Sequence, residues 1–167
     1  MHAVEHDLST EEMHPIDLVE TLAERREWEF DRVGEDQIAM AVEGSWRTYS
    51  LSLHWSGHDE MLKLVSSFDM SPPARRLNEL YRALDKANDQ LWGGAFSLWR
   101  EQGLMIYRYG LVLAGGGTAT AGQVERMLHA AVEASERFYP AFQLVCRAGA
   151  KAEDALEIAI SRAYGRA

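Results

Sequence analysis

Between residues 37 and 68, apolar and polar side chains alternate almost one by one, and this alternation narrows the choice of fold more than any other feature of the chain. The clearest run places Tyr49, Leu51, Leu53 and Trp55 against Thr48, Ser50, Ser52 and His54. Successive side chains of a strand point to opposite faces of its sheet. The period of two therefore predicts strands with one face on a core and the other toward water.

Short turn sequences separate this run from similar runs on either side. Strands are expected near residues 28–33, 37–43 and 61–68, with turns at Gly34-Glu35-Asp36, Gly44-Ser45 and residues 56–59. Turns of this length join strands that run in opposite directions. The pattern predicts an antiparallel meander of four strands.

Helical spacing takes over on both sides of the meander. A helix is predicted over residues 15–26, because Pro15 suits a first turn and an apolar stripe follows it. After Pro73, an apolar stripe over residues 77–91 predicts a second helix, with Ser71 as its N-cap. Two further strands are expected between residues 95 and 113.

The rest of the chain is expected to be helical. Residues 114–122 read as a linker, since their glycines lack the spacing of a phosphate-binding loop. Thr120 and Gln123 form a capping box for a long helix, which Pro140 should kink or end. A last helix is predicted over residues 152–164. Runs of strands and then of helices indicate an α+β domain with an antiparallel sheet of five to six strands and helices packed on one side.

The charge is concentrated near the N-terminus. The chain carries a net charge of −9, while residues 1–43 contain thirteen acids and three bases, which gives 3 − 13 = −10. An acidic surface repels phosphate backbones, so a nucleic-acid partner is not expected. This region reads either as a solvated helix and hairpin or as a docking face for a basic partner.

Composition also bears on the compartment. No apolar run approaches the length of a membrane span, and the N-terminus lacks the pattern of a secretory signal. Cys146 is a single cysteine in an apolar helical stretch, which favours a buried side chain over a reactive thiol. We therefore expect a cytoplasmic protein without a membrane partner.

Candidate chemistry is sparse. His54 and His58 are four residues apart with carboxylates beside them, but they span a strand end and a turn, so exposed turn residues are expected and no metal or other cofactor. His2, His6 and His14 lie in or beside the polar N-terminal segment. No motif of a catalytic serine or cysteine is present. Among the five tryptophans, Trp46, Trp55 and Trp99 are the candidates for binding a partner, although core or sheet-face positions account for most such residues.

Several segments together resemble a known family. They are Trp46-Arg47 with the alternating strand to Trp55, the helix with Leu77-Asn78-Glu79-Leu80 and Asn88, Gly94-Ala95-Phe96, Tyr107-Arg108-Tyr109, and Phe138-Tyr139-Pro140-Ala141. This arrangement is similar to the YbjN family of bacterial proteins, often described as sensory-transduction regulators. The resemblance implies a fold like that of type III secretion chaperones, a twisted antiparallel sheet flanked by helices, and it brings no catalytic residues.

The chain accordingly divides into a flexible acidic tail at residues 1–14, a YbjN-like domain at 15–145 and a C-terminal helical extension at 146–167. The expected function is a non-catalytic binding or regulatory module, chaperone-like in its fold, that engages a protein or peptide partner in bacterial sensory or stress regulation. An uncharacterised small-molecule-binding or metal-dependent enzyme is the alternative. One layer of helices would leave the second sheet face bare, so a homodimer through that face is expected as well.

Overall fold

The computed structural model describes residues 13–164, with side chains as far as Ser161. Its elements are α1 (Pro15–Arg25), β1 (Glu29–Arg32), β2 (Gln37–Glu43), β3 (Thr48–Ser56), β4 (Met61–Asp69), the 3-10 turn η1 (Ala74–Arg76), α2 (Leu77–Asp89), β5 (Ala95–Trp99), β6 (Leu104–Val112), α3 (Ala121–Arg147) and α4 (Ala152–Tyr164).

The strands form one six-stranded antiparallel sheet in the order β1-β2-β3-β4-β6-β5. The first four are the predicted meander, and β6 joins its end as a neighbour of β4. Along β2, β3 and β4, buried side chains alternate with exposed or half-buried ones. The predicted α+β class with five to six antiparallel strands is confirmed.

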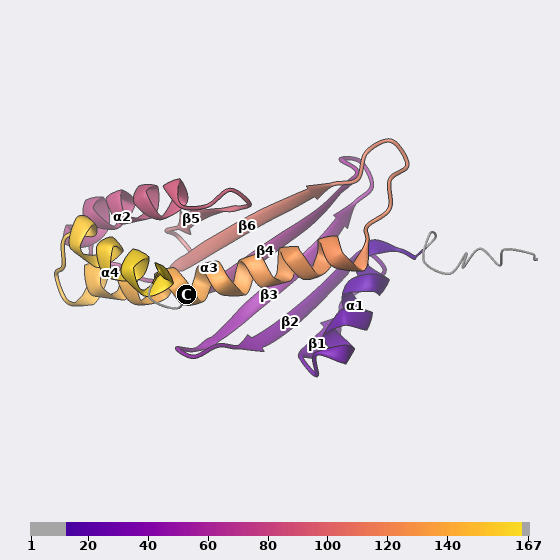
Figure 1. The fold of residues 1–167 in the computed structure, drawn as a ribbon, viewed down its shortest axis with the longest axis horizontal. Helices are drawn as coiled ribbons and strands as arrows, with labels where there is room; N and C mark the ends of the chain where they lie inside the picture. Colours follow the sequence, from indigo (N-terminus) through magenta and orange to yellow (C-terminus); the bar gives the residue numbers. More distant parts are fainter. Residues whose placement is uncertain (1–12, 165–167) are drawn as a thin grey trace, which may run out of the picture.

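One face of the sheet carries the core. Figure 1 shows α3 crossing the sheet, with α1 beside it over β1 and β2 and with α2 and α4 gathered near β5. Side chains from all four helices join the inward residues of the strands in one hydrophobic cluster. Ala152, Ala155 and Leu156 of α4 are buried in it, so the segment predicted as a C-terminal extension packs into the same core. Residues 146 and 147 belong to α3.

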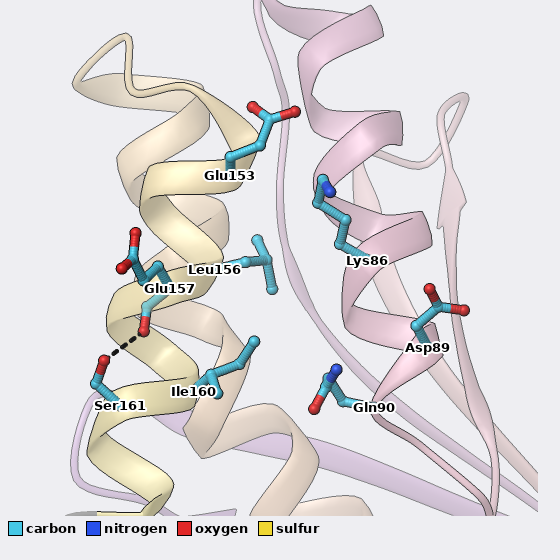
Figure 2. A pocket seen from close by; sticks show the side chains of 8 residues that line it. All are labelled: Lys86, Asp89, Gln90, Glu153, Leu156, Glu157, Ile160 and Ser161. Carbon is cyan, nitrogen blue, oxygen red and sulfur yellow. Dashed lines mark hydrogen bonds between the residues drawn. The ribbon is translucent and has the colours of Figure 1, made fainter.

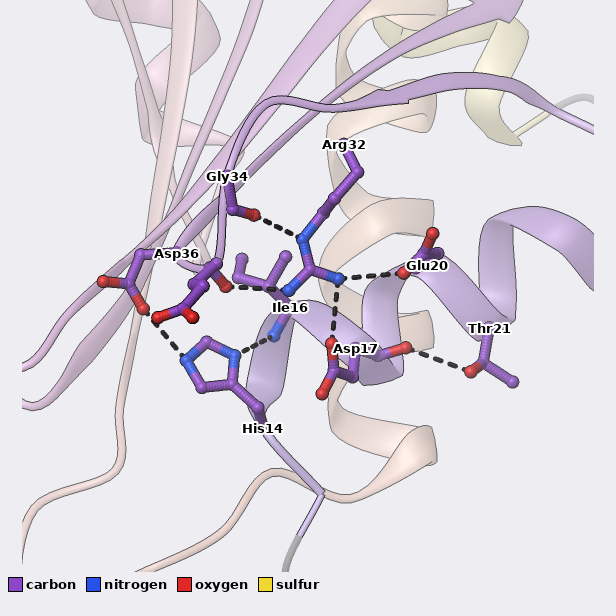
Figure 3. A network of polar contacts seen from close by, with 9 residues as sticks. His14, Ile16, Asp17, Glu20, Thr21, Arg32, Gly34 and Asp36 are labelled. Carbon is purple, nitrogen blue, oxygen red and sulfur yellow. Dashed lines mark hydrogen bonds and ion pairs between the residues drawn. The ribbon is translucent and has the colours of Figure 1, made fainter.

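Arg32 fastens α1 to the first hairpin (Figure 3). Its guanidinium donates to Asp17 and Glu20 of α1, each at 2.8 Å, and also to the backbone carbonyls of Gly34 and Glu35. These carboxylates raise the pKa of Arg32, which keeps its charge. Two acids of the acidic N-terminal quarter are therefore used to position α1 on the sheet.

His14 caps α1 and contacts the sheet. Its Nδ1 accepts a hydrogen bond of 3.1 Å from the Ile16 N–H, and its Nε2 lies 3.0 Å from Asp36 (Figure 3). The ring also meets Trp55 edge-on, with 6.5 Å between ring centroids. The flexible tail was predicted over residues 1–14, and all of these except Met13 and His14 lie outside the described residues. His14, the last residue of the predicted tail, is a structural cap of α1.

The long helix α3 begins as predicted but does not end at its proline. Thr120 and Gln123 form the capping box, with hydrogen bonds of 2.9 and 3.1 Å. The helix continues through Pro140 to Arg147. Pro140 removes one backbone hydrogen bond. On both sides of it the helix buries Phe138, Ala141, Phe142 and Val145, and this packing offsets the loss.

The start of α2 differs from the prediction. Pro72 and Pro73 are followed by η1, and α2 begins only at Leu77. Ser71 is therefore too far from the helix to cap it, and no side-chain cap is found at this end. Instead, Arg76 donates hydrogen bonds of 2.8 and 2.6 Å to the carbonyls of Val145 and Ala150, which ties the turn to the end of α3.

No helix in the described part of the chain is long and apolar enough to cross a membrane.

Candidate functional site

Over β2, β3 and β4, the sheet face away from the core is lined mostly by small side chains. Strand registers align two rows that each cross all six strands. The first row is Glu29, Ala41, Ser50, Ser67, Ile106 and Ser97, and the second is Asp31, Ala39, Ser52, Val65, Arg108 and Ala95. We call these two rows the open face.

The open face is hollowed at its centre. A shallow cavity of about 410 Å³ lies over β1 to β4, bordered by Glu29 and Asp31 and floored by Ala39, Ala41, Ser50, Ser52, Val65 and Ser67. Serine and alanine side chains extend little from a pleated sheet, so the hollow follows directly from the composition of these rows. It can accept side chains of a segment laid over the sheet.

Charge differs between the two sides of the open face. Glu29 and Asp31 stand exposed on β1, at one edge of the sheet, while Arg108 is exposed on β6, close to the other. His54 and Lys63 lie opposite each other beyond the second row and are exposed. The hollow therefore has an acidic border on the β1 side, and the basic groups of this sheet face lie outside it.

The three predicted partner-binding tryptophans do not come together. Trp46 is 51% exposed in the turn between β2 and β3, and Trp99 is 40% exposed at the end of β5, opposite Leu104. Leu104 pairs with Asp69, whose carboxylate lies 3.5 Å from Arg47, so Trp46 and Trp99 share one end of the sheet.

Trp55 lies at the opposite end of β3 and on the core side, where it is half-buried against the hydrophobic cluster. It belongs to the fold and is not part of the open face. Trp92, which the sequence reasoning did not single out, is the most exposed large apolar side chain in the described chain, at 103%. Its position between the end of a helix and Gly93-Gly94 is the signal that could have found it.

The turn that carries Trp46 is held by α3. Glu136 accepts hydrogen bonds from the Tyr49 hydroxyl at 2.7 Å and from the Ser45 N–H at 2.9 Å. Burial and the neighbouring carboxylate raise the pKa of Tyr49, so its hydroxyl remains a donor. A side chain at Gly44 would collide with Glu136 and Tyr49, which explains the glycine in this turn.

The histidine pair predicted to be exposed turn residues lies as expected. His54 is at the end of β3 and His58 is in the following turn, both exposed. Asp59 beside them is held by Lys63 at 2.5 Å and by Ser56 at 2.9 Å, and these contacts lower its pKa. Within the described residues, no three side chains of the metal-binding types gather in one place. The lack of a metal or other cofactor stays a prediction.

Cys146 is buried, and burial raises the pKa of its thiol. A protonated, enclosed thiol is a poor nucleophile, in line with the structural role predicted for it.

A second concavity separates α2 from α4. It has a volume of about 420 Å³, with Leu156 and Ile160 pointing from α4 toward Lys86 of α2 and Gln90 just after that helix (Figure 2). At one end the helices are tied together, since Glu79 accepts from the Ala152 N–H at 2.7 Å and Arg82 pairs with Glu153. The groove between the helices is bordered by charges of both signs.

Comparison with known proteins agrees with this architecture. A family model described as "YbjN: Putative bacterial sensory transduction regulator" matches residues 15–144. Among solved structures, one titled "Crystal structure of YbjN, a putative transcription regulator from E. coli" matches with a TM-score of 0.53 and 9% sequence identity. The match covers 81% of this chain and 92% of the other. A search of curated proteins gives no match.

Proposed function

The chain belongs to the YbjN family, whose model describes a bacterial sensory-transduction regulator, and from this premise we propose a non-catalytic regulatory module that binds a basic protein segment on its open face. The observation that carries the proposal is the hollowed double row of small side chains over β1 to β4.

The shape of the open face supports a protein segment as the occupant. Ala41, Ser50 and Ser67 stand side by side across three strands, as do Ala39, Ser52 and Val65. A segment laid over these rows could reach the sheet backbone closely, since none of these side chains is large. The serine hydroxyls offer hydrogen bonds without the cost of burying a charge.

The border of the hollow supports a basic partner. Glu29 and Asp31 stand on the β1 side. They belong to the first 43 residues, whose net charge is −10. Complementary charge speeds the encounter between partners and selects against acidic ones.

The lining of the hollow supports binding in place of catalysis. A serine needs an adjacent base to become a nucleophile. No histidine is among the residues that line the hollow, and its two acids lie at the border. This lining supports recognition as the proposed function.

The two concavities allow a matched test. In the Ser52→Arg variant a large side chain fills the hollow of the open face, while in the Ser161→Arg variant an equal change falls in the groove between α2 and α4. Proteins that bind the tagged wild-type chain in a bacterial lysate are identified by mass spectrometry, and their affinities are then measured with purified partners.

The proposal expects a basic partner that Ser52→Arg weakens at least tenfold and that Ser161→Arg leaves unchanged. Reversing the border with Glu29→Lys and Asp31→Lys should weaken it and flatten its salt dependence. A partner lost only in the Ser161→Arg variant would move recognition to the helical groove and refute the open face as the binding surface.

A further inference from the structure

A polar cavity lies between α3 and the turn that joins α2 to β5, away from the open face. Its volume is about 330 Å³, and it is bordered by Gln90 to Gly93, by Tyr107 and Tyr109 of β6, and by the outer side of α3. This volume lies at the lower end of the range of small-molecule sites, which is about 300–1,000 Å³.

The α3 side of the cavity carries two arginines. Arg126 and Arg137 are eleven residues apart, which is close to three helical turns, so both lie on the side of α3 that borders the cavity. Ala130 and Ala134 between them leave the space open, and Glu133 adds one acceptor, which also pairs with His129 at 3.1 Å. Two cations face the cavity of a chain whose net charge is −9.

Arg137 has a donor without a partner. Its Nε atom is buried and forms no hydrogen bond within the described residues. The guanidinium lies over the ring of Phe138, with 4.9 Å between its central carbon and the ring centroid. A buried donor left unpaired costs about 1–3 kcal/mol, and more for a charged group. Because this Nε atom is enclosed, a ligand in the cavity would bind the terminal nitrogens of the Arg137 guanidinium.

The opposite side of the cavity carries an exposed aromatic side chain on an anchored turn. The Tyr107 hydroxyl donates to the Gly93 carbonyl at 2.7 Å. Gly93 also packs on the ring of Tyr109, since a Cβ atom there would lie 2.6 Å from the ring. Trp92, next in the chain, is fully exposed on this turn. The exposed indole at the rim of the cavity offers a stacking surface for a planar ring.

We propose that this cavity binds a small organic anion that carries a planar aromatic ring, with Arg126 and Arg137 on the anionic group and Trp92 stacked on the ring. A nucleoside monophosphate and an aromatic carboxylate share this chemistry. The ligand occupies a surface separate from the open face, so this inference stands or falls independently of the proposed protein partner.

The test uses the full chain and two probes, adenosine 5′-monophosphate and indole-3-acetate, followed by NMR. Saturable shifts are expected for the Trp92 indole N–H and for the amides of Gly93 and Ala130 with at least one probe. Inorganic phosphate alone should bind at least tenfold more weakly, because it lacks the ring. Isothermal titration gives the affinities.

Arg126→Gln, Arg137→Gln and Trp92→Ala should each weaken the probe at least fivefold. Arg100→Gln, a change at an exposed arginine of the β5–β6 turn, should not. Arg126 is exposed, so its variant remains informative even if Arg137→Gln lowers the melting temperature. The proposal is overturned if neither probe gives saturable shifts, if phosphate binds as tightly as the probes, or if Arg126→Gln and Trp92→Ala bind like the wild type.

Discussion

The hydroxyl of Tyr49 lies 2.7 Å from Oε1 of Glu136, and this hydrogen bond joins β3 to the middle of α3 across 87 residues of sequence. The same carboxylate holds the Ser45 N–H in the turn that carries Trp46. The Glu136 side chain therefore helps to position both the buried Tyr49 and the turn at one end of the sheet.

Tyr49→Phe should destabilise the protein by about 1–3 kcal/mol, because a hydrogen bond to a charged acceptor is lost while the ring remains. The midpoint of urea unfolding measures the change. Tyr81→Phe is the matched control, since Tyr81 is 42% exposed on α2, and its effect should stay within about 0.5 kcal/mol. Equal effects of the two changes would show that the Tyr49–Glu136 contact contributes nothing to stability.

The strands could be predicted from the sequence because each has one side on the core and one on water. Apolar and polar residues therefore alternate along each strand, most clearly from Tyr49 to Trp55. The order of strands is a different matter. No local pattern encodes the placement of β6 beside β4, with β5 at the edge.

Helix ends were predictable only where the signal was local. The Thr120–Gln123 box is contained within four residues, and it formed as expected. Pro140 does not end α3, because packing on both sides of it maintains the helix, and Ser71 does not cap α2, because a 3-10 turn precedes that helix. His14 was missed as a cap because histidine is not among the residue types preferred at this position, although the hydrogen bond that it accepts from the Ile16 N–H is local.

The candidate sites were harder to predict than the fold. The open face depends on the registers of six strands, which bring Ser52 beside Ala39 and Val65. The polar cavity needs Trp92 and Arg137 together, and these are separated in sequence by β5, β6 and the first part of α3. Its residue type made Trp55 a candidate for binding a partner, but the structure shows that its side chain is half-buried against the core.

The side chain of Asn88 forms hydrogen bonds with the backbone of the edge strand β5, as a neighbouring strand would. Its side chain accepts from the Phe96 N–H at 2.7 Å and donates to the Phe96 carbonyl at 3.1 Å. Asn88→Ala should therefore cost about 1–3 kcal/mol and speed hydrogen exchange at the Phe96 amide. Asn78→Ala, at an exposed position of the same helix, should change neither quantity. Unaltered exchange at Phe96 in the Asn88 variant would contradict the expected role.

Stability should fall at alkaline pH as tyrosines that are buried in the folded protein ionise in the unfolded chain. Burial raises the pKa of Tyr107 from an ordinary value near 10 to about 12. Between these values the unfolded chain has released the phenolic proton and the folded chain has kept it, so the free energy of unfolding decreases as pH rises from 10 toward 12. The Tyr107→Phe variant, measured by urea unfolding at pH 8, 10 and 11, should lose less stability across this range than the wild type. The two chains losing the same amount would rule out Tyr107 as a source of the decline.

Self-association should take place through the open face. Its small residues let two sheets approach closely, and two-fold dimers are the commonest oligomers. A two-fold axis parallel to the strands would place the β1 side of one copy over the β5–β6 side of the other, and so bring Glu29 and Asp31 toward Arg108. The charges of this face then match a second copy of itself. The same face is the proposed site for a basic partner, so dimer and partner complex should exclude each other.

Size exclusion with light scattering at micromolar concentrations is the measurement. The wild type should approach twice 18.8 kDa as its concentration rises. Ser52→Arg and Arg108→Glu should stay at the monomer mass, the first by filling the hollow and the second by placing like charges opposite Glu29 and Asp31. Ser161→Arg should behave like the wild type, because it lies on α4 at the groove facing α2. A wild-type mass near 18.8 kDa at every concentration would refute the dimer and leave the open face to the partner alone.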